Sequence, residues 1–247
     1  MANTPRSGVT PALSAVAAFV LASCVSPTEP VIPEDNVGFH FRTNLPCVRA
    51  EVNGRDATLV VASALPRTAI ASSLKGERSA ARILLSSTLF THVRPAALDV
   101  ADLPADGLLG ADAFRGRIAT IDYFRGLLVI SAWPKAQPDA MPWSFSGGPP
   151  RVPVVINGRA TWAIVDTALP DTAVIPGELV GTSNGSRGTV SLEIAGIRFE
   201  NLDVAINPVV TPRLGNRVLY RFVVTIDYAH ERIGLWPDPR TSDAPLR

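Results

Sequence analysis

The chain has 247 residues, of which 47% are hydrophobic and 18% are charged. This length suffices for one large or two small domains with a buried core, and the composition excludes an intrinsically disordered chain. The formal net charge of +1 gives no sign of the basic surface that binds nucleic acid, so we expect no nucleic-acid partner.

Residues 1–24 have the pattern of an export signal. Arg6 supplies a positive charge, and the apolar stretch at residues 9–21 is too short to span a membrane comfortably. The letters LASC at residues 21–24 resemble the bacterial lipobox, in which Cys24 becomes the lipidated first residue of the mature protein. The alternative is an ordinary cleaved signal in which Cys24 has no role. We expect a lipid-anchored protein of the bacterial cell envelope, in the periplasm or on the outer face.

A proline-rich tether is predicted at residues 25–37. After Cys24 only Cys47 remains, so the mature chain cannot form an internal disulfide, and we expect Cys47 to be a small buried residue. The histidines are scattered without the spacing of metal ligands, and no phosphate-binding glycine loop is present. We therefore expect neither a metal nor a cofactor. The histidines are His40, His92 and His230.

From residue 38 onwards the sequence predicts strands. Alternating apolar residues predict strands at 38–42, 48–52 and 57–61, with a hairpin turn at Asn53-Gly54. A short helix is predicted at residues 111–117. Residues 132–153 are rich in proline and hold Gly147-Gly148, a composition that predicts a linker.

Much of the chain is an internal repeat with an offset of 104 residues, which becomes 105 in the later segments because the alignment shifts by one residue. The period is too long for a solenoid unit and indicates two domain-sized lobes. The matched segments are NGR at residues 53 and 157, ALP at 64 and 168, LDVA at 98 and 202, LG at 109 and 214, and TIDY at 120 and 225.

The most informative stretch of the second copy is WAIVDTALPDTAVIP, at residues 162–176. Its first apolar run ends in a carboxylate at Asp166. A carboxylate at the end of a buried strand is costly unless hydrogen bonds hold it. Asp166 is therefore either a functional acid or a residue that caps a turn through its own backbone amides.

Each half resembles one lobe of the retropepsin-like, pepsin-type aspartic peptidases. That pattern is a strand, an Asn-Gly turn, an apolar strand ending in Asp-Thr-Gly, a flap hairpin, Asp-Gly-Leu-Leu-Gly, a short helix and a TIDY strand. The resemblance covers nearly all of residues 38–237. It implies an all-β fold of two pseudo-twofold-related lobes, with a cleft between them and a short helix in each lobe. The implied division is a first lobe at 38–131, a linker at 132–153, a second lobe at 154–237 and a tail at 238–247.

The resemblance assigns the catalytic motif of the second lobe to Asp166 and Thr167, with Ala168 where the family usually has Gly. The matching acid of the first lobe is missing, because Ala62 stands there, and we treat Ala62 as a degenerate catalytic position. The Asp-Gly-Leu-Leu-Gly segment also differs between the copies. The first copy keeps it as DGLLG at residues 106–110, whereas the second reads TPRLG at residues 211–215.

Two other acids remain open as substitutes for the missing carboxylate. They are Asp106 and Asp171, although Asp171 lies opposite Arg67 in the repeat and could instead form a charge pair with it. Asp122 and Asp227 of the TIDY segments are interpreted as structural turn residues. The resemblance places flaps at residues 72–87 and 181–194, with the second tip at 181–188. Residues 181–185 also match G-x-S-x-G, but the expected strand and helix around a serine nucleophile are missing.

Three functions follow from these residues. The first is a monomeric, catalytically impaired peptidase relative that binds extended peptide in its cleft. The second is an active aspartic endopeptidase in which two chains pair and each contributes Asp166. The third is a structural envelope lipoprotein without catalysis. In all three, the N-terminal lipid holds the protein to a membrane.

Overall fold

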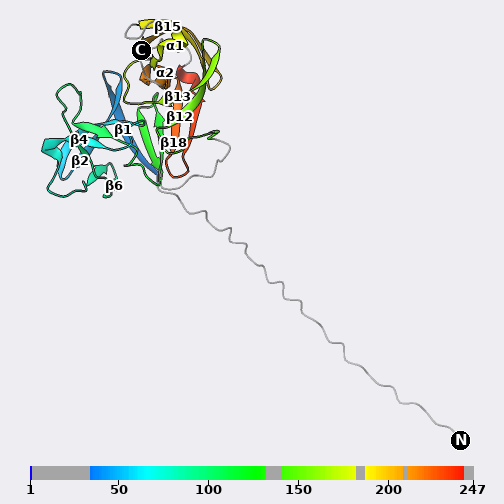
Figure 1. The fold of residues 1–247 in the computed structure, drawn as a ribbon. Coiled ribbons are helices and arrows are strands. Elements are labelled where there is room, and N and C mark those ends of the chain that lie inside the picture. The colour runs from blue at the N-terminus through cyan, green and yellow to red at the C-terminus, as the bar shows by residue number, and fades with distance from the viewer. Residues whose placement is uncertain (2–33, 132–140, 182–186, 208–210, 242–247) are drawn as a thin grey trace. The chain divides into compact units, whose positions relative to one another are not determined.

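The computed structural model describes Met1 and residues 34–131, 141–181, 187–207 and 211–241 (Figure 1). Three predicted features lie wholly or largely outside these ranges, namely the signal with Cys24, the tether up to residue 33 and the G-x-S-x-G match. None of the helices within the described ranges has the length and hydrophobicity needed to span a bilayer.

The first half of the described chain is built almost entirely from strands. In β1 buried and exposed side chains alternate, as expected for a strand with one face on the core. Asn53 and Gly54 have φ angles of 53° and 82°, the conformation of a tight hairpin turn, which confirms the predicted turn. The elements are β1 (Glu34–Arg42), β2 (Leu45–Val52), β3 (Arg55–Val61), β4 (Ala69–Ala71), the 3₁₀ helix η1 (Ser72–Leu74), β5 (Ile83–Leu85), β6 (Thr88–Phe90), β7 (Ala96–Leu98), β8 (Gly107–Leu109), β9 (Ile118–Asp122) and β10 (Leu127–Ser131).

The second half repeats this order with two short α-helices. Strands β13 and β14 lie 104 residues after β3 and β4, so the offset seen in the sequence is also the offset of the strands. The elements are β11 (Trp143–Ser144), β12 (Arg151–Ile156), β13 (Arg159–Val165), β14 (Ala173–Ile175), α1 (Gly177–Val180), β15 (Arg187–Ile194), β16 (Ile197–Ile206), β17 (Arg213–Leu214), α2 (Asn216–Leu219), β18 (Phe222–Asp227), β19 (Arg232–Pro237) and the 3₁₀ helix η3 (Pro239–Thr241).

The described strands form one 13-stranded sheet and one closed barrel. The main path of the sheet is β11-β19-β18-β9-β10-β1-β2-β3-β8-β4-β7, with β5 and β6 off this path. The barrel has the order β12-β13-β17-β14-β16-β15. In both halves the strand before the candidate site has a parallel neighbour, since β3 pairs with β8 and β13 pairs with β17.

The two halves meet where β9 pairs with β18 in antiparallel register. Thr120 lies opposite Thr225, its equivalent in the repeat, and the two hydroxyl oxygens are 2.8 Å apart in a hydrogen bond. Antiparallel pairing of equivalent residues places a local twofold axis between them. Side chains from both halves then share one large apolar cluster, which includes Leu59 and Phe114 as well as Val165 and Leu214.

One local prediction is wrong. Residues 111–117 form consecutive turns with i→i+3 hydrogen bonds instead of a helix, because Asp112 accepts bonds from Thr68 and Gly116 turns left-handed with a φ of 71°. The hairpin of β15 and β16 turns at Ala195-Gly196, whereas most of the predicted flap tip at residues 181–188 lies outside the described residues. The strand predicted at 189–194 is confirmed within β15.

Cys47 confirms its prediction as a small buried residue. Its side chain is buried in β2 and makes no disulfide. Burial raises the pKa of its thiol, so the neutral form is favoured.

Candidate functional site

The candidate site begins where β13 ends. Asp166 follows Val165 directly, and its N–H donates to the carbonyl of Leu214 in the parallel neighbour β17 (3.0 Å). Its Oδ1 accepts a bond from the N–H of Ala168 (3.1 Å), which is the turn-capping geometry expected of an Asp at this place. Asp166 is only 5% exposed, so its charge requires a partner.

Arg213 is that partner. Its Nη2 and Nε lie 2.6 Å and 3.0 Å from Oδ2 of Asp166, so two N–H groups converge on one carboxylate oxygen. Arg213 opens β17, next to Ile164 of β13, and its own side chain is 40% exposed. The carboxylate of Asp166 is therefore held in an ion pair that reaches the protein surface.

Ala62 takes the equivalent place in the first half. Its N–H donates to the carbonyl of Leu109 (2.9 Å), as that of Asp166 does to Leu214, so the two backbones match. Ala62 is fully buried and offers a methyl group where Asp166 offers a carboxylate. Leu108 stands at the position of Arg213, so the first half has replaced a charged pair by an apolar one.

Four hydrogen bonds join the two halves just beyond these positions. The Ser63 N–H donates to Thr167 Oγ1 (2.9 Å), and this hydroxyl donates to the carbonyl of Val61 (2.5 Å). In the mirror arrangement the Thr167 N–H donates to Ser63 Oγ (3.1 Å), and that hydroxyl donates to the carbonyl of Val165 (2.6 Å). Thr167 therefore acts as a positioning residue that fixes one loop against the other.

The two site glycines are required by close backbone packing. A Cβ on Gly215 would lie 2.1 Å from the carbonyl oxygen of Asp171, and one on Gly110 would lie 2.7 Å from the backbone of Arg67. Ala168, in contrast, tolerates its methyl group by packing on apolar side chains of the first half. These are Leu45, Cys47, Val60 and Ala105.

A buried tyrosine is connected to the loop of Asp166. The Tyr123 hydroxyl donates to Asn216 Oδ1 (2.8 Å), and Asn216 Nδ2 donates to the carbonyl of Thr167 (2.8 Å). Burial, and after it the negative charge of Asp166, raises the pKa of Tyr123 above its usual range. Burial likewise raises the pKa of Tyr228, whose hydroxyl lies 3.5 Å from the carbonyl of Ser63. Both hydroxyls remain protonated donors at neutral pH.

Asp106 does not lie beside Ala62. Its Oδ2 accepts a bond from the N–H of Thr58 (2.8 Å). Thr58 precedes Ala62 by four residues of extended strand, which is roughly 13 Å. Asp106 therefore anchors the middle of β3, away from Ala62.

Asp171 also points elsewhere. It is 43% exposed and lies 3.8 Å from Nη1 of Arg187 on β15. Arg67, its possible partner across the axis, donates instead to the carbonyl of Arg94 (2.7 Å).

The paired TIDY carboxylates are turn residues, as predicted. Asp122 Oδ1 accepts a bond from the N–H of Arg125 (2.9 Å). Asp227 Oδ1 accepts bonds from the N–H groups of Ala229 and His230. Within the described ranges no group of three or more His, Cys, Asp or Glu side chains could hold a metal ion.

Arg213 was not predicted as the partner of Asp166. A signal was present, because Arg213 replaces the apolar Leu108 of the first copy in a strand next to the one that ends in Asp166. Two unusual charges on neighbouring strands, both absent from the other copy, indicate an ion pair.

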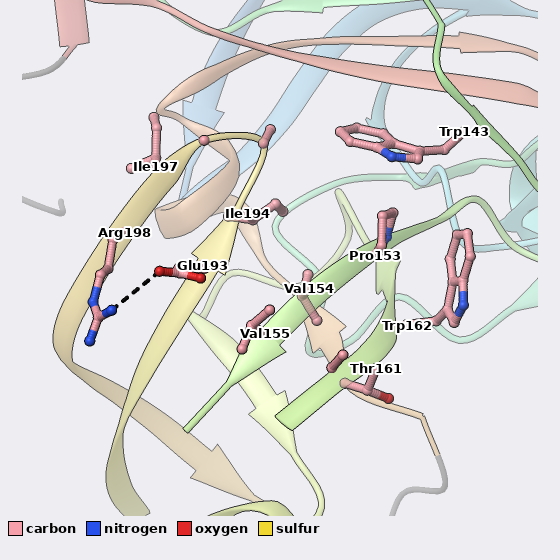
Figure 2. A pocket seen from close by; sticks show the side chains of 13 residues that line it. Trp143, Pro153, Val154, Val155, Thr161, Trp162, Glu193, Ile194, Ile197 and Arg198 are labelled. Carbon is pink, nitrogen blue, oxygen red and sulfur yellow. Dashed lines mark hydrogen bonds and ion pairs between the residues drawn. The ribbon is translucent and has the colours of Figure 1, made fainter. Parts of the chain in front are cut away.

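A hollow of about 700 Å³ lies elsewhere, on the outer side of β12, β13 and the β15–β16 turn (Figure 2). Trp143, Pro153 and Trp162 line one part of it, and the ion pair of Glu193 with Arg198 (3.2 Å) lies at another. None of its lining residues belongs to the Asp166–Arg213 pair.

No family model and no curated protein matches the chain. The crystal structure of the aspartic proteinase from Irpex lacteus is similar to it, with a TM-score of 0.61 at 12% sequence identity. The match covers 85% of this chain and 99% of that chain. An identity this low shows the fold alone. The chain therefore has a mostly β, aspartic proteinase-like fold, which confirms the predicted fold class.

Proposed function

We propose that this chain is an envelope lipoprotein that binds extended peptide segments between its two lobes and does not cleave them. The observation that supports the proposal is the ion pair of Asp166 with Arg213, opposite the methyl group of Ala62. The fold alone would not support this proposal, because one fold hosts many functions.

The loss of cleavage follows from the chemistry of the missing acid. Aspartic peptidases use two carboxylates that share one proton, so that one activates water while the other donates to the scissile carbonyl. Here Ala62 has no group to ionise, and Arg213 occupies Oδ2 of Asp166. Each lost acid–base role is worth roughly a hundred- to ten-thousand-fold in rate.

Peptide binding remains chemically reasonable at the same place. An arginine carries five N–H groups, and the bonds to Asp166 use two of those on Arg213. The remaining donors, on a side chain that is 40% exposed, suit the carbonyl oxygens of an extended backbone. Peptides recognised in this way add main-chain hydrogen bonds along a strand edge.

The bonds between Ser63 and Thr167 weigh against the homodimeric peptidase. They already occupy the face of the Asp166 loop with the chain's own first half. A second chain could present its Asp166 there only if these buried bonds were broken. We therefore expect the working protein to be a monomer.

The test is incubation of the full chain with a mixed peptide library from acid to neutral pH, together with a peptide-binding assay. Asp166→Asn, Arg213→Met and the matched surface control Arg198→Met are compared. We expect no cleavage, and peptide binding that Arg213→Met weakens and Arg198→Met does not. Cleavage that disappears in Asp166→Asn would establish a peptidase instead, and dimers in sedimentation would then favour the paired form. Absence of any peptide binding would favour the structural lipoprotein.

The lipid anchor is tested separately. In a bacterial host, we expect the chain to incorporate labelled palmitate and to sediment with membranes, and Cys24→Ser to do neither. Labelling that persists in Cys24→Ser, or its absence from the unaltered chain, would contradict the anchor.

A further inference from the structure

A second concavity, which we call the aromatic pocket, opens beside the β9–β10 turn. Its walls include Phe41, Tyr123, Phe124 and Tyr220, and Arg125 and Arg217 lie at its rim. Its volume of about 450 Å³ is that of a small-molecule site. The pocket is connected to the candidate site through Tyr123, which donates to Asn216.

The internal repeat provides a control for this pocket. Phe145 and Tyr228 are the equivalents of Phe39 and Tyr123, because the N–H of Phe145 donates to the carbonyl of Glu231 as that of Phe39 does to Gly126, and both pairs of rings meet edge-on. In that copy Phe114 stacks on Tyr228 (5.8 Å between centroids, 16° between planes) and is only 1% exposed. In the pocket copy the position of Phe114 holds the smaller Leu219, and the ring that stacks on Tyr123 is instead Phe41, which is 41% exposed. The ring that stacks on the tyrosine is thus buried in one copy and exposed in the other.

The aromatic pocket presents flat faces. The rings of Phe41 and Tyr123 are nearly parallel, at 14° and 6.1 Å between centroids. Tyr220 lies 6.2 Å from the first ring and 6.3 Å from the second, tilted against both. Such faces favour a flat apolar group that stacks on them or meets them edge-on.

The rim adds a charge preference. Among the described residues that line the pocket there is no Asp or Glu, whereas Arg125 and Arg217 are both present. Arg125 is 64% exposed, and its contact with Asp122 is long, at 3.7 Å. Guanidinium groups bind carboxylates through paired hydrogen bonds, and they repel cations that aromatic faces would otherwise attract.

We propose that the aromatic pocket binds a small aromatic carboxylate. The ring of the ligand stacks against Phe41 and Tyr220, and its carboxylate meets Arg125 and Arg217. This site is separate from the peptide site proposed above and does not depend on it.

The test is isothermal titration of the full chain with three probes of one shape, namely 1-naphthoate, neutral 1-naphthylmethanol and cationic 1-naphthylmethylamine. We expect 1-naphthoate to bind about tenfold more tightly than the alcohol, which is the effect of one charged hydrogen bond, and the amine to bind weakest. Saturable binding that does not depend on probe charge, or no saturable binding of 1-naphthoate, would overturn the proposal.

Variants locate the site. Phe41→Ala should weaken 1-naphthoate binding about tenfold or more, whereas Arg217→Gln should abolish the preference for 1-naphthoate over the alcohol. Trp162→Ala is the matched control, because Trp162 is a comparably exposed aromatic residue on another face and should change nothing. Arg217 is exposed, so its variant remains informative even if Phe41→Ala does not fold. Unchanged binding in Arg217→Gln would refute the assignment.

Discussion

Replacing Arg213 by leucine tests whether the ion pair, rather than either residue alone, is the unit that the fold requires. Arg213→Leu leaves Asp166, which is 5% exposed, without the two guanidinium donors on its Oδ2. The double variant Asp166→Ala/Arg213→Leu instead reproduces the first half, where Ala62 and Leu108 occupy the same two places. The double variant thus gives the second copy the same two residue types that the first copy has at these places.

The magnitude follows from burial. Removing one partner of a buried pair costs about 3–5 kcal/mol, but the Arg213 side chain is 40% exposed, so water can partly replace it. We expect Arg213→Leu to lower the free energy of unfolding by about 2–3 kcal/mol, or roughly 30- to 150-fold in the folding equilibrium. We expect the double variant to lie within about 1 kcal/mol of the unaltered chain, because apolar replacement of a buried pair is often neutral.

The assay is urea unfolding of the unaltered chain, both single variants and the double variant at pH 7. Tryptophan fluorescence and circular dichroism should give coincident curves if unfolding is two-state. The double-mutant cycle then yields the coupling energy between Asp166 and Arg213. Additive single effects, with a coupling below about 0.5 kcal/mol, would refute the reasoning, as would a double variant less stable than Arg213→Leu.

Three further outcomes follow from the contacts. Ser63→Ala removes a donor and an acceptor of the inter-lobe bonds, so thermal unfolding should show a loss of about 2–3 kcal/mol, and a loss below 0.5 kcal/mol would show that these bonds are dispensable. Gly215→Ala should severely impair folding because its Cβ has no room, whereas Gly38→Ala, with nothing within 4 Å, should fold normally; soluble yield and circular dichroism distinguish them. Burial acts to raise the pKa of Asp35, but hydrogen bonds from residues 86–88 outweigh it and lower that pKa. A carboxylate whose pKa is lowered in the folded state stabilises the protein above about pH 4, and this stabilisation is lost as the pH falls further. Asp35→Asn should therefore lower the free energy of unfolding by about 1 kcal/mol at pH 7 and progressively less in acid. A cost that does not change with pH would contradict this.

The architecture was predictable because the repeat carries redundant information. Asn-Gly turns and apolar strands recur at one offset, so each half supports the reading of the other. Thr120 and Thr225 are found directly opposite each other, as a twofold relation of equivalent residues requires. The backbone match of Ala62 with Asp166 follows from the same offset.

The remaining details depend on side chains that differ between the copies. Comparison of the copies marks Arg213 and Asp166 as two charges that the first copy lacks, but a sequence spacing of 47 residues does not by itself show that their strands are neighbours. The helix predicted at 111–117 is replaced by turns because Asp112 bonds to Thr68, a contact between distant residues. Local propensity cannot anticipate such tertiary bonds.

Fusion of the two halves into one chain has a consequence for the Thr120–Thr225 axis. In a dimer of identical halves, every substitution near that axis would be made twice, so an arginine at the place of Arg213 would be accompanied by a second one. In a single chain the two halves can differ in sequence at equivalent positions. One half can hold a charged pair while the other holds Ala62 and Leu108, and the ring stacked on the tyrosine can be buried at one place and exposed at the other.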